Sequence, residues 1–182
     1  MIDSMMKLGT ITASLVLLAT SSASATEIVR AKIDGFQEVP AAIFTEASGS
    51  FHASIYGDIV EFELTYTGLD EVLGAHIHFG RPGVNGGIIF FFCQDQETPL
   101  GDPPDGVEHC PDGDQTITGR FKASDVVGPE AQGIAPEDGE AAIAAILARA
   151  TYINIHTSAF VSGEIRGAIK SVRDRNRDRE RY

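Results

Sequence analysis

The chain has 182 residues, a formal net charge of −12, two cysteines and no tryptophan. An acidic protein of this kind repels nucleic acid and anionic membranes, which argues against both as main partners and suits cations better. The length is ample for one domain that buries most of its apolar surface.

The N-terminus has the pattern of a secretory signal peptide. Lys7 precedes an apolar run from 8 to 19, and Ala23-Ser24-Ala25 is typical of a cleavage site. A membrane-spanning helix needs about 20 apolar residues, and this run is shorter and interrupted by polar ones. We therefore predict that residues 1–25 are removed, that no segment spans a membrane, and that the protein is secreted or periplasmic.

Alternation of apolar and polar residues dominates the rest of the chain. From Ile59 to Tyr66 every second residue is apolar, which is typical of a half-buried antiparallel strand. The all-apolar stretch 88–92 predicts a strand covered on both faces. The pattern favours an all-β fold, an eight-stranded Greek-key sandwich or barrel over residues 26–170. Strands are predicted near 27–35, 48–56, 59–68, 73–79, 87–93, 115–122, 151–157 and 163–170.

One short helix is predicted between the last strands. Pro136 and the acidic residues that follow it favour a helix N-terminus, and Ile143 and Ile146 then fall at helical spacing. Residues 171–182 mix both charge signs with almost no apolar side chain, so we expect a flexible tail.

Cys93 and Cys110 are the only cysteines. In an exported protein such a pair predicts a disulfide, here one that closes the Pro-, Gly- and Asp-rich stretch 94–114. The chain-entropy model gives such a loop about 3 kcal/mol of stabilisation.

Three histidines lie on the polar faces of predicted strands. His76 and His78 are two residues apart, so they share one face at roughly 6 to 7 Å along the backbone. His156 follows Ile153 and Ile155, which point inward, so it also points away from the core. We expect all three on the outer surface of the barrel, with His52 as a weaker fourth candidate ligand.

Imidazoles in an exported protein without a free thiolate suit copper, which we favour, or zinc. Single outward histidines are more often only solvated strand residues, so that alternative stays open. Asn154, Glu164 and Arg166 are expected to surround the ligands, although a surface salt bridge between the latter two, worth under about 1 kcal/mol, is the commoner arrangement. No nucleophile elbow, phosphate loop or EF-hand spacing is present, so no catalytic residue is assigned.

Several ordered motifs resemble the chordin-type CHRD domain across residues 28–169. They are GFQEVP at 35–40, GAHIHFG at 74–80, YINIHT at 152–157 and GEIRG at 163–167. The resemblance implies a barrel similar to Cu/Zn superoxide dismutase, in which an H-x-H strand binds copper on the outside. By that motif, the resemblance implies that His76 and His78 are copper ligands. It implies no zinc site, because no cluster of further His and Asp residues has the needed spacing. An acidic body would also repel superoxide, so a dismutase is not expected.

Three functions follow as hypotheses. The first, which we favour, is an exported, non-catalytic metal-binding barrel. The second is an extracellular interaction module with a protein partner and no metal, whose histidines hydrogen-bond to neighbours such as Asn154 or Glu164. The third is a copper-dependent redox enzyme.

Overall fold

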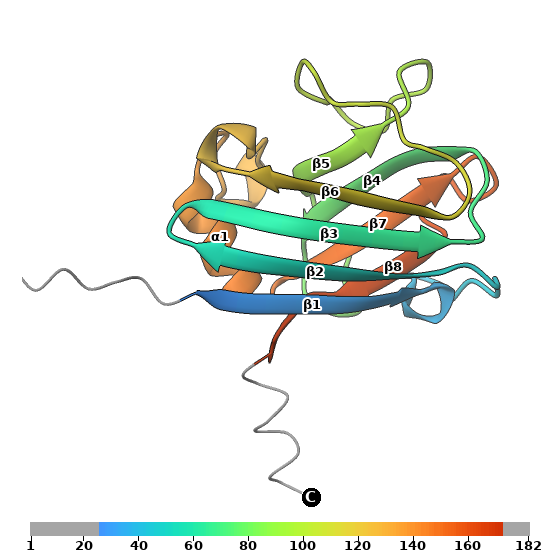
Figure 1. Ribbon diagram of the computed structural model, residues 1–182, viewed down its shortest axis with the longest axis horizontal. Helices are drawn as coiled ribbons and strands as arrows, with labels where there is room; N and C mark the ends of the chain where they lie inside the picture. The colour runs from blue at the N-terminus through green and yellow to red at the C-terminus, as the bar shows by residue number, and fades with distance from the viewer. Residues whose placement is uncertain (1–25, 173–182) are drawn as a thin grey trace, which may run out of the picture.

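The computed structural model describes residues 26–172. The predicted signal peptide at 1–25, and residues 173–182 of the predicted tail, lie outside the described residues (Figure 1). In the described part of the chain, no helix is both long and apolar enough to cross a membrane.

Between residues 26 and 172, nine strands form one antiparallel sheet in the order β5-β4-β7-β8-β1-β2-β3-β6, and β9 pairs with β1. The predicted strands are confirmed, except that the last is divided in two around Ile169, whose backbone N–H bonds to the Thr151 carbonyl. The strands are β1 (Glu27–Asp34), β2 (Ser48–Tyr56), β3 (Ile59–Thr67), β4 (Val72–Phe79), β5 (Ile88–Gln94), β6 (Gln115–Phe121), β7 (Thr151–Thr157), β8 (Ile165–Ala168) and β9 (Lys170–Ser171).

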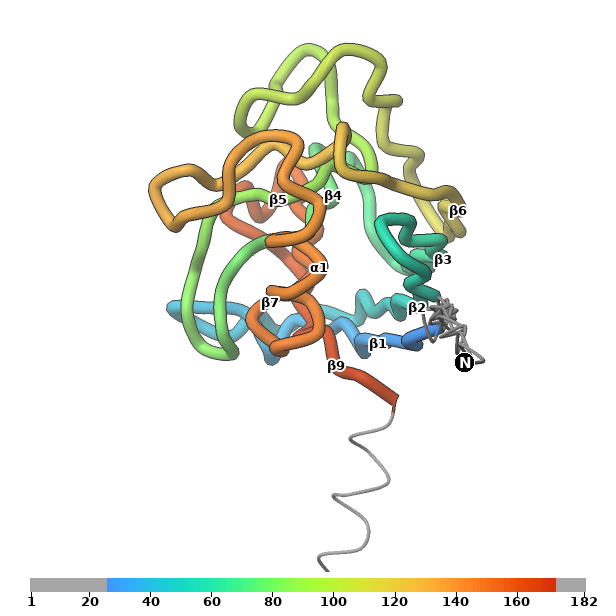
Figure 2. Tube along the Cα trace, turned by 90° about the vertical axis from the view of Figure 1, so that its left-hand side faces the viewer, coloured from blue at the N-terminus to red at the C-terminus, as the bar shows by residue number. Residues whose placement is uncertain are grey.

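The sheet curls into a nearly closed barrel, as Figures 1 and 2 show. Its two end strands, β5 and β6, approach each other through aromatic side chains. Phe90 of β5 stacks on Phe121 of β6 with ring centroids 4.4 Å apart, and Phe62 of β3 meets Phe90 edge-on at 5.9 Å. The predicted all-β barrel is therefore confirmed.

Strand alternation places the core inside the barrel. Phe51 on β2 and Leu64 on β3 face each other in register and are fully buried, while Glu61 and Glu63 on the opposite face are exposed. Strands β4 and β7 differ, because nearly every residue of both is buried on either face. Loops therefore cover the outer side of this half of the barrel.

The one α-helix of the described residues, α1 (Gly139–Leu147), lies across one end of the barrel (Figure 2). Asp138 caps it by accepting a hydrogen bond from the Ala141 N–H at 2.9 Å, which satisfies one of the free donors of the first turn. Ile146 packs into the core. Three short 3₁₀ turns complete the described elements: η1 (Gly35–Gln37), η2 (Ala123–Asp125) and η3 (Glu130–Gln132).

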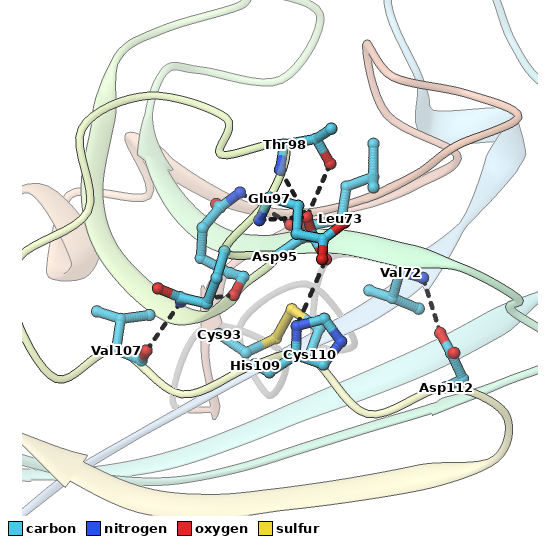
Figure 3. Close-up of polar contacts among 12 residues, drawn as sticks. Val72, Leu73, Cys93, Asp95, Glu97, Thr98, Val107, His109, Cys110 and Asp112 are labelled. Atoms are coloured by element: carbon cyan, nitrogen blue, oxygen red, sulfur yellow. Dashed lines mark hydrogen bonds and ion pairs between the residues drawn. A yellow bond between two sulfur atoms is a disulfide. The ribbon is translucent and has the colours of Figure 1, made fainter.

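The disulfide between Cys93 and Cys110 is present, as predicted, and both residues are buried. It fixes the long loop that follows β5 (Figure 3). Asp95 lies 3.5 Å from the ring of His109, and Asp112 accepts a hydrogen bond from the Val72 N–H at 2.9 Å. The loop is thus held at both ends, next to the start of β4.

Candidate metal centre

His76 and His78 of β4 and His156 of β7 converge on one point. The two strands pair antiparallel, with Gly74 opposite His156 and His76 opposite Asn154. The ring of His76 lies 5.5 Å from that of His78 and 5.2 Å from that of His156, centroid to centroid. One ring nitrogen from each histidine lies within 4.8 Å of the other two. The structure thus brings together the three ligands that the sequence proposed.

The three rings lie on the outer side of the barrel wall, as predicted, but they are not solvated. They are on the side of the sheet away from the core, but their exposed fractions are only 0% for His76 and 8% for His78 and His156. Phe91 of β5 meets His76 edge-on at 4.6 Å. The loops that contain Gly86 and Val161 cover the rings of His78 and His156 and accept a hydrogen bond from each. Strand alternation alone does not show that these loops exclude solvent.

Each histidine uses one ring nitrogen in a hydrogen bond to an acceptor. His76 Nε2 donates to Gln94 Oε1 at 2.8 Å, His78 Nδ1 to the Gly86 carbonyl at 2.9 Å, and His156 Nδ1 to the Val161 carbonyl at 3.0 Å. The amide of Gln94 is oriented by its own donation to the Leu73 carbonyl at 2.8 Å. These bonds place the proton of each neutral ring on the nitrogen that donates.

The other nitrogen of each ring has no hydrogen-bond partner. His76 Nδ1, His78 Nε2 and His156 Nε2 are all buried and unsatisfied. Buried polar atoms are almost always paired, so three unpaired atoms of one type at one place require an explanation. Each carries a free lone pair, and a metal ion is the species that accepts three converging imidazole lone pairs.

Burial strongly disfavours protonation of the three rings. It lowers the pKa of His76 from the ordinary 6.5 to about 3, with further lowering from the neighbouring His156 and His78. Burial likewise lowers the pKa of His78 and of His156 to about 4. All three are therefore neutral near pH 7, the form in which imidazole coordinates metal.

A family model for the CHRD domain matches residues 29–169. The chain belongs to the CHRD-domain family. No curated protein and no solved structure gives a significant match. The matched region spans β4 and β7, so the three converging histidines lie within the CHRD domain.

In this CHRD domain, Arg166 supports the centre through Tyr152 and a loop. Its guanidinium lies 3.5 Å above the Tyr152 ring, and it donates to the Val84 carbonyl at 2.7 Å and to Asn85 Oδ1 at 2.8 Å. These bonds hold the loop whose Gly86 carbonyl accepts from His78. Arg166 thus contacts no ligand ring in a hydrogen bond but positions one indirectly.

Glu164 and Asn154 also form hydrogen bonds near the centre without bonding to a histidine ring. Glu164 accepts hydrogen bonds from Thr157 at 2.7 Å and Thr45 at 2.8 Å, at the base of the turn that contains Val161. Asn154 donates to Glu38 at 2.7 Å. The alternative of a surface salt bridge between Glu164 and Arg166 is not found, because both residues are buried and each has other partners.

His52 is not brought to the centre. It is exposed on β2, opposite Arg30 of β1 and Glu63 of β3. The residue that sequence reasoning missed is Gln94, which ends an apolar strand and turns its amide toward His76. A lone polar side chain at the end of an all-apolar strand was the available signal.

Proposed function

We propose that this CHRD protein is an exported, non-catalytic metal-binding protein, with copper favoured over zinc. The observation that carries the proposal is the set of three buried, unpartnered ring nitrogens within 4.8 Å of one another. Their three rings come from two paired strands, so the rigid sheet keeps them together.

The second ring nitrogen of each histidine supports the same conclusion. Metal-ligating histidines usually donate this N–H to a carbonyl or carboxylate, which fixes the tautomer and the direction of the ring. Here the acceptors are two backbone carbonyls and the amide oxygen of Gln94. Every ring is therefore oriented with its free lone pair toward the common point.

The donor set favours copper or zinc over hard cations. Three imidazole nitrogens and no carboxylate or thiolate make a poor site for calcium or magnesium, which prefer oxygen. For a given nitrogen site, divalent affinity rises to a maximum at copper and is lower for zinc. Copper is the expected ion where both are present.

Burial of the centre supports binding rather than turnover. The three ligand side chains are at most 8% exposed, and the rings of Phe91 and Tyr152 flank them. A substrate would have little access to the ion. The disulfide fits export, because such bonds persist in oxidising compartments.

Metal titration of the purified exported protein, first stripped with chelator, tests the proposal. We expect one copper ion per chain, and tighter binding of copper than of zinc. His76→Ala and His78→Ala remove ligands and should abolish stoichiometric binding. His109→Ala is the matched control, because His109 is exposed on the disulfide loop and outside the centre. Circular dichroism of each variant checks that the fold is retained.

Failure of the wild-type protein to bind either ion at one per chain would contradict the proposal and favour a metal-free interaction module. Equal loss of binding in His109→Ala would place the ion elsewhere. Catalytic turnover of superoxide or peroxide by the loaded protein, lost with the same ligand variants, would replace the non-catalytic role with the redox one.

A further inference from the structure

A second cluster of functional side chains lies on the outer face of β1 and its neighbours, away from the histidine centre. There an open cleft of about 510 Å³ is bordered by β1, β2 and the last strands. None of the three metal-centre histidines lines it, and no acidic residue does. The polar side chains around it are those of Arg30, Lys32, Gln37, Ser50, His52 and Lys170.

Strand register arranges the cations as a small array. Arg30 and Lys32 are two residues apart on β1 and alternate with the buried Val29, Ala31 and Ile33, so they share the outer face roughly 7 Å apart. Lys170 of β9 lies opposite Arg30, at the inter-strand spacing of about 5 Å. On the other side of β1, β2 places a histidine and a serine opposite these two cations.

The clustering runs against the charge of the molecule. The chain carries a net charge of −12, yet three of the eight Lys and Arg residues between 26 and 172 line this one cleft. Like charges directly opposite one another on paired strands are destabilising, as Arg30 and Lys170 are here. Without a counter-charge, repulsion between these side chains destabilises the fold. A bound anion would offset that repulsion.

No carboxylate of the described residues neutralises these three side chains. The structure records no ion pair or side-chain hydrogen bond for Arg30, Lys32 or Lys170, and the Nε of Arg30 is buried without a partner. Glu61 and Glu63 border the adjacent hollow beyond His52, and Asp34, two residues from Lys32 on β1, accepts a hydrogen bond from Gln37 at 3.1 Å. None of these three carboxylates lines the cleft itself. The unpaired donors therefore point to an anionic ligand.

We propose that this cleft binds a small phosphorylated compound that carries at least two charged groups. A guanidinium offers two parallel N–H donors that match phosphate geometry, and ammonium groups add point charges. The three cationic side chains start from backbone positions about 5 and 7 Å apart, so two linked phosphate groups can contact more of them than a single phosphate can. Ala168, with its small side chain, leaves space between the cationic side chains. The site is independent of the metal centre.

Calorimetric titration of the metal-free protein with tripolyphosphate, orthophosphate and citrate tests this assignment. Metal is removed first because tripolyphosphate chelates it. We expect one tripolyphosphate per chain, bound more tightly than orthophosphate or citrate. Lys32→Gln and Lys170→Gln should each weaken binding roughly fivefold, as expected for loss of one exposed ion pair. Lys122→Gln, the same charge change at an exposed residue outside this cleft, should leave affinity unchanged.

Absence of saturable tripolyphosphate binding at millimolar concentration would overturn the proposal. So would an equal loss of affinity in Lys122→Gln, which would indicate only general charge attraction, or tighter binding of citrate, which would contradict the phosphate assignment. His76→Ala should retain full tripolyphosphate affinity. Absence of metal binding would therefore not contradict the proposal that this cleft binds an anion.

Discussion

Tyr152 lies face to face on His78, with ring centroids 4.9 Å apart and ring planes only 7° from parallel. The guanidinium of Arg166 covers the remaining face of Tyr152 at 3.5 Å. The hydroxyl of Tyr152 also accepts a hydrogen bond from the Gly86 N–H at 3.1 Å, while the Gly86 carbonyl accepts from His78. Tyr152 therefore fixes both the ring of one candidate ligand, His78, and the loop that orients it.

Replacing Tyr152 with leucine should weaken metal binding about tenfold, because loss of a supporting residue leaves the His78 ring free to turn. Tyr152→Phe keeps the stacked ring and loses only the hydroxyl contact to Gly86, so it serves as the matched variant and should bind more tightly than Tyr152→Leu. Competition with a coloured chelator measures both affinities. Equal affinities in the two variants would show that stacking does not position the ligand.

Gln94 sets the tautomer of His76, and its removal should cost roughly 10- to 100-fold in metal affinity. Its side-chain oxygen accepts from Nε2, which leaves Nδ1 free toward the centre. Gln94→Leu removes the acceptor, whereas Gln94→Glu retains one. The same chelator competition should rank Gln94→Glu above Gln94→Leu. The opposite ranking would mean that His76 binds through its other nitrogen.

Strand parity was sufficient to predict which histidines could meet. In β4 and β7 the apolar residues Ile77, Ile153 and Ile155 alternate with the ligands, and a period of two leaves His76 and His156 on the same face of the sheet. The pairing of β4 with β7 is not local, since it joins residues more than 70 positions apart in the chain, and the sequence alone did not establish it.

The all-apolar run 88–92 indicated that this part of the barrel is covered on both faces, but the segments that cover the histidines could not be predicted. This cover depends on loops whose backbone carbonyls, those of Gly86 and Val161, bind the rings, and carbonyl positions carry no sequence signal. The partners of Glu164 and Arg166 could not be predicted for the same reason. Parity placed both away from the core, but the loops that bury them and supply their partners lie far away in sequence.

The disulfide should contribute to stability and to the metal centre together. Cys93 precedes Gln94 directly, and the Gln94 N–H bonds to the Glu108 carbonyl of the loop that the disulfide closes. A Cys93→Ala, Cys110→Ala double variant should lose about 3 kcal/mol in free energy of unfolding, measured by urea denaturation. Its copper affinity should also fall, because the end of β5 is less fixed. Unchanged stability would show that core packing holds this loop in place without the disulfide.

Acid should destabilise the metal-free protein in the pH range where only the unfolded chain protonates these histidines. Burial holds the pKa of His76 at about 3 and those of His78 and His156 at about 4, whereas an unfolded histidine titrates near 6.5. The unfolded state therefore binds more protons between about pH 6.5 and 4, and stability is complete above 6.5 and falls as the pH is lowered through that range.

The slope expected is about 1.4 kcal/mol per pH unit for each histidine, once the pH is well below 6.5. Urea denaturation in the presence of chelator at pH 7, 6 and 5 measures it, above the range where most carboxylates titrate. His78→Gln removes one of the groups and should reduce the slope, whereas His109→Gln, outside the centre, should not reduce it by as much. Equal free energies of unfolding at pH 7 and pH 5 in the wild-type protein would contradict the burial of neutral imidazoles on which the metal centre depends.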